Sequence, residues 1–168
     1  MGKIKFLIMD VDGTLTDGKI YMGENGELFK AFDIKDGCGI KDILPEYGII
    51  PIIITARNSK ILENRCRELN IDMLFQGERN KIERVDQILK LFSDKDAKQY
   101  DYSNCAYIGD DILDLQCMIP IKNMGGIVGC PLDAVEDIKK IADFISRKNG
   151  GSGAVREFIE WILMKTKQ

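Results

Sequence analysis

The stretch KIKFLIMDVDGT, residues 3–14, decides the fold. Its first part, residues 3–9, is a short apolar run that ends directly at Asp10. An apolar run of this length, followed by a turn signal such as Asp12-Gly13, is typical of a strand buried in a parallel sheet. Ligands bind beyond the carboxyl ends of such strands, so we expect the functional site just after residue 9.

Apolar runs of the same kind recur along the chain and alternate with helical patterns. Further strands are predicted at 49–54, 73–75, 104–108, 127–129 and 142–145. Helices are predicted at 36–47, from Asn58 or Ser59 to about Leu69, at 80–92 and at 153–165. This alternation predicts an α/β fold with a doubly wound, mainly parallel sheet, although the element order does not fix the strand order.

One segment departs from the alternation. Residues 18–33 contain two alternating apolar segments around Glu24-Asn25-Gly26, and Asn-Gly between such segments is a strong hairpin signal. We therefore predict a β-hairpin inserted after the first strand. The length predicts a single domain over 1–168, which ends in a glycine-rich tail and helix at 149–165.

Composition narrows the chemistry. The chain has 168 residues, a net charge of −3 and no histidine, which excludes Ser-His-Asp triads and His-ligated metals. Acid–base work must fall to side chains such as Asp, Glu or Lys, and a metal site would be built from oxygen ligands, which suit Mg²⁺.

The composition also indicates which binding partners and which cellular compartment to expect for the protein. The acidic balance argues against a nucleic-acid partner, and no apolar run approaches the ~20 residues that span a bilayer, so no membrane partner is expected. The five cysteines are odd in number and none forms a C-x-x-C pair. Reduced thiols in a cytoplasmic protein are the expected outcome.

Acidic residues follow two of the predicted strands. Asp10 and Asp12 follow the first, and Asp110 follows strand 104–108. Carboxylates gathered at one sheet edge repel each other, and a bound Mg²⁺ is the simplest way to hold them together. Thr55, at the end of another strand, and Lys81, at the start of a helix, reach the same edge. Taken singly, they would be read as a helix cap and a surface lysine.

Four motifs in this order resemble the haloacid dehalogenase superfamily: DVDGT at 10–14, Thr55, Lys81 and GDDxxD at 109–114. The resemblance implies that Asp10 is a nucleophile that takes up a phosphoryl group and that Asp12 is the general acid and base. It implies that Thr55 and Lys81 bind the phosphoryl group, and that Asp10, Asp110 and the backbone carbonyl of Asp12 hold Mg²⁺. Asp111 and Asp114 would support that ligand set.

A wider set of segments is similar to the capless phosphatases of 3-deoxy-D-manno-octulosonate 8-phosphate, a small phosphorylated sugar acid of lipopolysaccharide biosynthesis. The likeness covers residues 17–41, 55–57, 65–71, 75–81, 107–111 and 150–163. It implies a homotetramer with the hairpins at its centre and a neighbour's glycine-rich tail over the site. By position, it implies substrate contacts from Asp33, Ile34, Lys35, Asp36, Gly37, Lys41, Arg57, Arg65 and Arg156. Here Lys41 replaces an Arg, Asp33-Ile34-Lys35 an Asn-x-Arg run, and Ala56 a Gly.

Other functions stay open at this point. The first is phosphatase action on a nine-carbon ulosonate 9-phosphate or a sialic acid phosphate, but in that branch the Arg57 position resembles a Glu. The second is a non-catalytic tetramerisation domain associated with a sialic acid cytidylyltransferase, which would not need the acids retained here. The third is a signalling receiver, which does not carry its acceptor in DxDGT.

Overall fold

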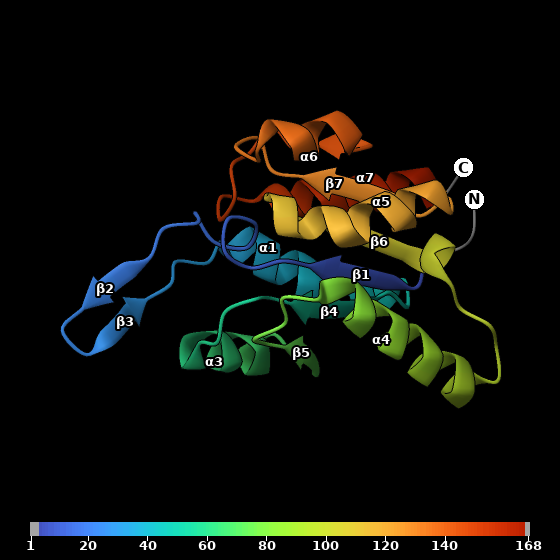
Figure 1. The fold of residues 1–168 in the computed structure, drawn as a ribbon, viewed down its shortest axis with the longest axis horizontal. Helices are drawn as coiled ribbons and strands as arrows, with labels where there is room; N and C mark the ends of the chain where they lie inside the picture. The colour runs from blue at the N-terminus through green and yellow to red at the C-terminus, as the bar shows by residue number, and fades with distance from the viewer. Residues whose placement is uncertain (1–3, 167–168) are drawn as a thin grey trace.

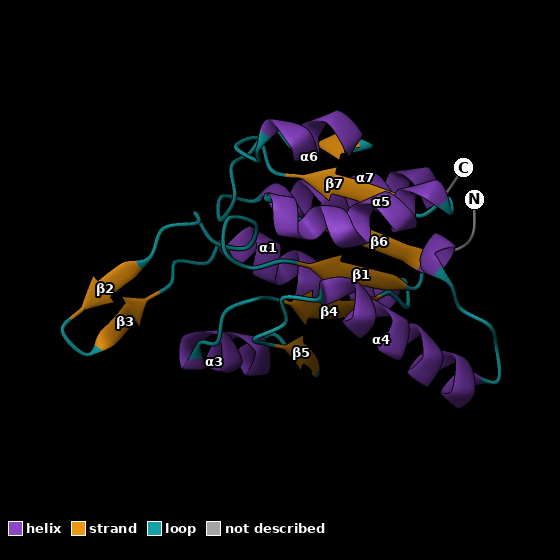
Figure 2. Cartoon of the chain, viewed as in Figure 1, coloured by secondary structure: helices purple, strands orange, loops and turns teal. Residues whose placement is uncertain are grey.

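The computed structural model describes residues 4–166, which form a parallel sheet between two layers of helices (Figures 1 and 2). The central strands are β1 (Phe6–Met9), β4 (Ile50–Ile54) and β6 (Cys105–Ile108). They are flanked by β5 (Met73–Phe75), β7 (Ile127–Cys130) and β8 (Phe144–Ile145). The six strands lie in the order β5-β4-β1-β6-β7-β8, and each neighbouring pair is parallel. The predicted α/β fold with a doubly wound sheet is therefore confirmed.

Alternation along the strands divides the core into two layers. In β1, Leu7 and Met9 pack on one face, and Phe6 and Ile8 pack on the other. The first face is covered by α1 (Ile34–Cys38), the π-helical turn η1 (Gly39–Ile43), α2 (Leu44–Glu46), α3 (Lys60–Glu68) and α7 (Ala154–Thr166). The second face is covered by α4 (Lys81–Asp96), α5 (Leu115–Asn123) and α6 (Glu136–Ile141). Since both faces are buried, the strands are apolar on both sides.

The strand order places the site. The chain leaves β1 towards β4 on one side, and β6 lies on the other side of β1. The order therefore reverses between β1 and β6, where open α/β sheets bind ligands. Met9 pairs with both Ile53 and Ile108, so the residues that follow the three strands emerge next to one another.

The predicted hairpin is present and extends away from the sheet (Figure 1). Strands β2 (Tyr21–Gly23) and β3 (Gly26–Phe29) pair antiparallel, and the turn between them is Glu24-Asn25. Tyr21 and Phe29 stack with their ring centroids 4.3 Å apart. The described chain contains no cap domain besides this hairpin, as the sequence indicated.

Several boundaries differ from the expectations. The first helix begins at Ile34 and not at residue 36, because the side chain of Asp33 caps it by accepting from Lys35 N at 2.7 Å. Helix α4 continues to Asp96, beyond the expected end at 92. Two helices were not predicted, α5, which carries Pro120 in its interior, and the short α6. Lys3, part of the expected first strand, lies outside the described residues, as do the two ends of the predicted 1–168 domain.

Candidate active site

Asp10 and Lys81 form the floor of the candidate site. Asp10 follows β1 directly, and Lys81 is the first residue of α4. Both are buried, and Lys81 Nζ lies 2.6 Å from Asp10 Oδ1 and 2.7 Å from Asp114 Oδ1. An ammonium this deeply buried is stable only when its charge is paired, so the two carboxylates hold Lys81 in place.

Asp114 has its hydrogen-bonding capacity filled by protein groups. Its Oδ1 accepts from Lys81 and from the hydroxyl of Tyr107 at 2.7 Å, and its Oδ2 accepts from the backbone N–H groups of Asp110 and Asp111 at 3.0 and 3.2 Å. A carboxylate offers about four acceptor positions, and all are used here. Asp114 therefore orients Lys81 and the loop after β6.

Asp10, Asp110 and Asp114 each place a carboxylate oxygen within 4.8 Å of the others. Burial, together with the charge of Asp114, raises the pKa of Asp10 to about 7 against the opposing effect of Lys81. Burial, together with the charges of Asp10 and Asp114, raises the pKa of Asp110 to about 8. Burial alone would lower the pKa of Lys81, but Asp10 and Asp114 outweigh it and raise that pKa. Three carboxylates thus share one ammonium, and full ionisation of all three would leave the cluster with a net negative charge.

The loop after β1 is shaped around these acids. Gly13 has a φ of +103°, and a Cβ on it would lie 2.0 Å from Asp110 Oδ2, so only glycine fits there. The hydroxyl of Thr14 donates to Asp110 Oδ1 at 2.9 Å. The tail also contributes, since Gly151 N donates to the Thr14 carbonyl at 3.1 Å. In this chain the glycine-rich tail therefore packs against the chain's own first loop.

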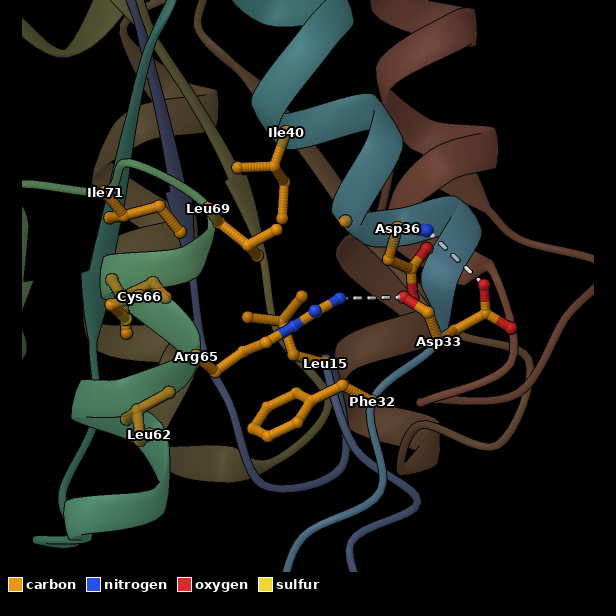
Figure 3. A pocket seen from close by; sticks show the side chains of 12 residues that line it. Leu15, Phe32, Asp33, Asp36, Ile40, Leu62, Arg65, Cys66, Leu69 and Ile71 are labelled. Carbon is orange, nitrogen blue, oxygen red and sulfur yellow. Dashed lines mark hydrogen bonds between the residues drawn. The ribbon is translucent and has the colours of Figure 1, made fainter.

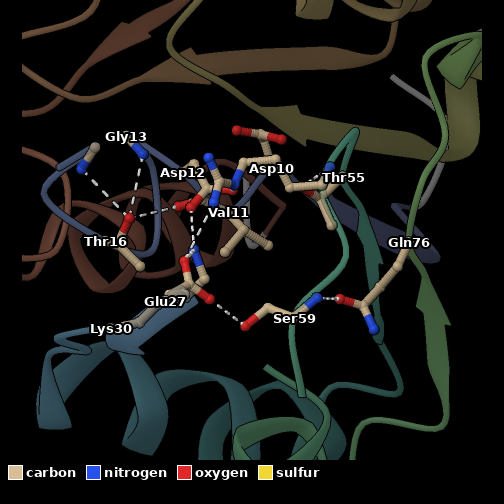
Figure 4. Close-up of polar contacts among 12 residues, drawn as sticks. Asp10, Val11, Asp12, Gly13, Thr16, Glu27, Lys30, Thr55, Ser59 and Gln76 are labelled. Atoms are coloured by element: carbon tan, nitrogen blue, oxygen red, sulfur yellow. Dashed lines mark hydrogen bonds and ion pairs between the residues drawn. The ribbon is translucent and has the colours of Figure 1, made fainter. Parts of the chain in front are cut away.

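Asp12 lies at the rim among charged side chains (Figure 4). Its Oδ1 forms a short ion pair with Lys30, and its Oδ2 lies 3.8 Å from Arg57 Nε. Thr55 is buried at the end of β4, where its hydroxyl oxygen accepts from Arg57 N at 3.4 Å. Asp111 is exposed, and its Oδ1 accepts from Ile112 N at 2.7 Å and caps the turn η3 (Ile112–Asp114).

Most of the predicted substrate contacts gather beside α1 and not around Asp10. Arg65 faces a cavity of about 10 Å³ between α1 and α3, and it donates to the Asp33 carbonyl at 3.5 Å (Figure 3). Gly37 packs closely against Arg65, because a Cβ on Gly37 would lie 2.4 Å from Arg65 Nη2. Within residues 4–166, Arg65 Nε has no hydrogen-bond partner.

The others are held in contacts within the chain. Asp36 is buried and accepts from Arg156 N at 2.7 Å, while the Arg156 guanidinium lies 2.7 Å from Glu160. Burial raises the pKa of Asp36 to about 6. Lys41 donates to the Glu68 carbonyl at 2.8 Å. Ile34 and Lys35 are exposed on α1. Of the predicted substrate contacts, only Arg57 has an ion pair with one of the core acids.

Four residues at the site were not predicted. Thr14 holds Asp110, Tyr107 holds Asp114, and Glu27 with Lys30 lies beside Asp12. For Tyr107 a signal existed, since a hydroxyl in an otherwise apolar strand needs a buried partner. For Glu27 and Lys30 there was none, because both look like the polar positions of an exposed hairpin.

The fold and this site together define a phosphatase of the haloacid dehalogenase superfamily, with an aspartate after the first strand, a buried lysine and an acidic pair after β6. No model of a protein family matches the sequence. The chain is 40% identical over 161 residues to the 3-deoxy-D-manno-octulosonate 8-phosphate phosphatase KdsC of Escherichia coli K12, covering 96% of this chain and 80% of that protein. The chain belongs to this family of phosphoric monoester hydrolases.

Solved structures agree with that assignment. The phosphatase of the same name from Yersinia pestis has a TM-score of 0.87 and 37% identity, over 98% of this chain and 83% of that one. The enzyme of the same name from Moraxella catarrhalis, solved with a magnesium ion, a phosphate ion and KDO, has a TM-score of 0.81 and 38% identity, over 96% and 86%. Among the helices of residues 4–166, none combines the length and apolar character needed to cross a bilayer.

Proposed function

We propose that this chain hydrolyses 3-deoxy-D-manno-octulosonate 8-phosphate to the free sugar acid and phosphate, with Mg²⁺ as cofactor and a phosphorylated Asp10 as intermediate. The observation that carries the proposal is the placement of Asp10, which lies at the switch point of the sheet between Lys81 and the acidic residues after β6. Membership of the family supports the reaction class and the substrate.

Each step has a residue in a suitable place. The Asp10 carboxylate attacks phosphorus, and the bond from phosphorus to the sugar oxygen breaks while Asp12 donates a proton to that oxygen. Asp12 then takes a proton from water, which attacks the phosphorylated Asp10 and releases phosphate. A covalent intermediate divides one difficult displacement into two easier ones. Thr55 and Lys81 bind the phosphoryl oxygens, and positioning of this kind supplies much of the rate in phosphoryl transfer.

The acidic residues fit a divalent cation. Burial and the neighbouring carboxylates raise the pKa values of Asp10 and Asp110, and a cation would favour their charged forms. Hard oxygen donors of this kind suit Mg²⁺. Asp10, Asp110 and the backbone carbonyl of Asp12 would hold the ion, while Asp114 is occupied by its four protein donors. When bound, the ion neutralises charge on the transferring phosphoryl group.

Recognition of the sugar acid is assigned first to Arg57. This side chain is 37% exposed and lies beside Asp12, so it reaches both solvent and the reacting end of the site. A guanidinium matches the geometry of a carboxylate. Arg57 favours the eight-carbon sugar acid over a nine-carbon one. Asp33, Ile34, Lys35, Asp36, Gly37, Lys41, Arg65 and Arg156 remain proposed contacts for the rest of the substrate.

We also propose that the protein is a homotetramer and that it is located in the cytoplasm. The hairpin exposes Ile20, Met22, Leu28 and Phe29, each between 49% and 64% accessible, and a homotetramer would cover them. A cytoplasmic location agrees with five free cysteines.

Phosphate release from a panel of sugar phosphates tests the function. The panel contains the eight-carbon ulosonate 8-phosphate, the nine-carbon ulosonate 9-phosphate and a simple hexose phosphate, each with and without Mg²⁺. We expect the highest kcat/KM for the eight-carbon substrate, and no turnover after chelation until Mg²⁺ is restored. A preference for the nine-carbon substrate would favour the alternative, and no release from any ester would contradict the proposal.

A further inference from the structure

The inward-facing side of the hairpin carries charged side chains that form ion pairs next to Asp12. Lys30 contacts Asp12 and lies 3.0 Å from Glu27 Oε1. Arg57 lies 3.4 Å from that same Glu27 oxygen and 3.8 Å from Asp12 Oδ2. Asp12, Lys30, Glu27 and Arg57 therefore form a ring in which negative and positive groups alternate. Figure 4 shows Lys30 and Glu27 reaching from the hairpin towards the Asp12 loop.

Burial makes this ring different from a surface ion pair. The Lys30 side chain is only 2% exposed, and those of Asp12 and Glu27 are 18% and 14% exposed. Exposed ion pairs hold their partners weakly, but a buried lysine loses its hydration and must keep its carboxylate neighbours. Lys30 therefore restricts where the Asp12 carboxylate can lie.

A second contact fixes Glu27 to the body of the protein. Ser59 donates its hydroxyl to Glu27 Oε2 at 2.6 Å, and Ser59 N donates to the side chain of Gln76 at 2.7 Å. Ser59 immediately precedes α3. The hairpin base is thus tied to the loop after β4, and Lys30 is presented to Asp12 from a fixed anchor.

We propose that Lys30 is a positioning residue for Asp12 and that Glu27 anchors it, so that the inserted hairpin sets the orientation of the acid–base aspartate. Lys30 does not touch the reacting atoms. It fixes the Asp12 carboxylate at the rim, where the leaving oxygen and then the attacking water must pass. A displacement of about 1 Å in such a group costs about a hundredfold in rate.

The role of Asp12 in this inference rests on the proposed function. In the same ring, Arg57 lies between Asp12 and Glu27 and contacts both. When the substrate carboxylate binds Arg57, Lys30 remains to hold Asp12. Recognition of the sugar acid and placement of the acid–base group are then separate tasks of two cations.

A double-mutant cycle tests the proposal. Lys30→Met is measured alone and together with Asp12→Asn, using Mg²⁺ with p-nitrophenyl phosphate and with the eight-carbon sugar phosphate. We expect Lys30→Met alone to lower kcat by about ten- to a hundredfold with KM within about threefold, and to change kcat less than about twofold when Asp12 is already Asn. Lys30→Arg keeps the charge and should recover part of the loss. Glu27→Gln should cost less than Lys30→Met.

Lys19→Met is the matched control, because Lys19 is exposed on the same hairpin segment. It should leave both kcat and the melting temperature unchanged. If Lys30→Met does not fold, Lys30→Gln takes its place in the cycle. An unchanged kcat, or an equal loss with and without Asp12, would overturn the positioning role. A wild-type protein that releases no phosphate from either ester would instead contradict the proposed function, and this inference would fall with it.

Discussion

The acid cluster and the hairpin differ in what completes them. Asp114 has protein donors on both oxygens, and Lys81 is enclosed by two carboxylates from its own chain. In the hairpin, β2 and β3 pair with each other, and within residues 4–166 they pair with no further strand. Leu28 and Met22 are 64% and 62% exposed there.

This difference indicates that the acid cluster serves the chemical reaction and that the hairpin serves assembly. The cluster is built from the side chains of one chain. A two-stranded hairpin is marginal by itself, and its exposed apolar side chains need a further surface. The base of the hairpin is the exception, since Glu27 and Lys30 turn inward to Asp12. We therefore expect substitutions in the cluster to affect turnover most, and substitutions of the exposed apolar side chains of the hairpin to affect assembly.

The largest effect is expected at Asp10. Asp10→Asn removes the nucleophile and should lower kcat by at least about 10⁴-fold. Asn has nearly the same shape, and removing one of three crowded carboxylates relieves repulsion, so the variant should melt no lower than the wild type. Phosphate release and thermal melting measure the two properties. Asp42→Asn, at an exposed position, should change neither. Turnover within tenfold of wild type would refute the phospho-aspartate mechanism.

A smaller loss is expected at Lys81. Lys81→Met keeps the volume but leaves Asp10 and Asp114 without their shared cation. Breaking a buried ion pair in this way costs about 3–5 kcal/mol of stability. We also expect kcat/KM to fall about 10²- to 10³-fold through lost phosphoryl binding. Urea unfolding and steady-state kinetics check both. Lys90→Met, on the exposed side of the same helix, is the control, and equal effects at the two lysines would show that the cluster is not special.

The cluster also predicts a pH-dependent stability in metal-free protein. The pKa of Asp10 is raised from 3.8 to about 7, and that of Asp110 from 3.8 to about 8. Between about pH 4 and pH 8, these two carboxyl groups therefore bind more protons in the folded state than in the unfolded state. By linkage, the contribution of these two groups to the free energy of unfolding is largest below about pH 4, and it falls as the pH rises towards 8.

Magnesium should reverse this trend, because a cation favours the charged carboxylates. We expect Mg²⁺ to raise the melting temperature by several degrees at pH 8 and by less at pH 5. Differential scanning calorimetry at both values, with EDTA as reference, measures the shift. Asp110→Asn should abolish most of it. An equal Mg²⁺ effect at both pH values would argue against ion binding at this cluster.

The sequence predicted where the acidic residues and Lys81 meet better than it predicted the contacts that hold them there. Asp10, Thr55 and Asp110 could be placed because strand ends of a parallel sheet meet at one edge, and Lys81 because it begins a helix that starts at the same edge. Helix α5 was missed because Pro120 interrupts the helical signal, although the first part of the helix lies before it. The contact between Lys30 and Asp12 could not be predicted, because a polar residue after an alternating segment gives no sign of where a hairpin folds back. Pairing between distant segments is set by tertiary packing, which local patterns do not encode.

The smallest effect on turnover, and the sharpest test of the contrast, is expected at the exposed apolar side chains of the hairpin. Leu28→Asp places a charge on a side chain that is 64% exposed and that the proposed tetramer would bury. Since a buried unpaired charge costs several kcal/mol, we expect the assembly to dissociate while the domain stays folded. Sedimentation velocity measures the mass and circular dichroism the fold, and turnover should fall less than about tenfold. The matched control is Leu91→Asp on α4, because Leu91 is 56% exposed and lies outside the hairpin. If both variants keep the wild-type mass, the hairpin surface does not mediate assembly, and if Leu28→Asp loses turnover as severely as Asp10→Asn, the site is not complete within one chain.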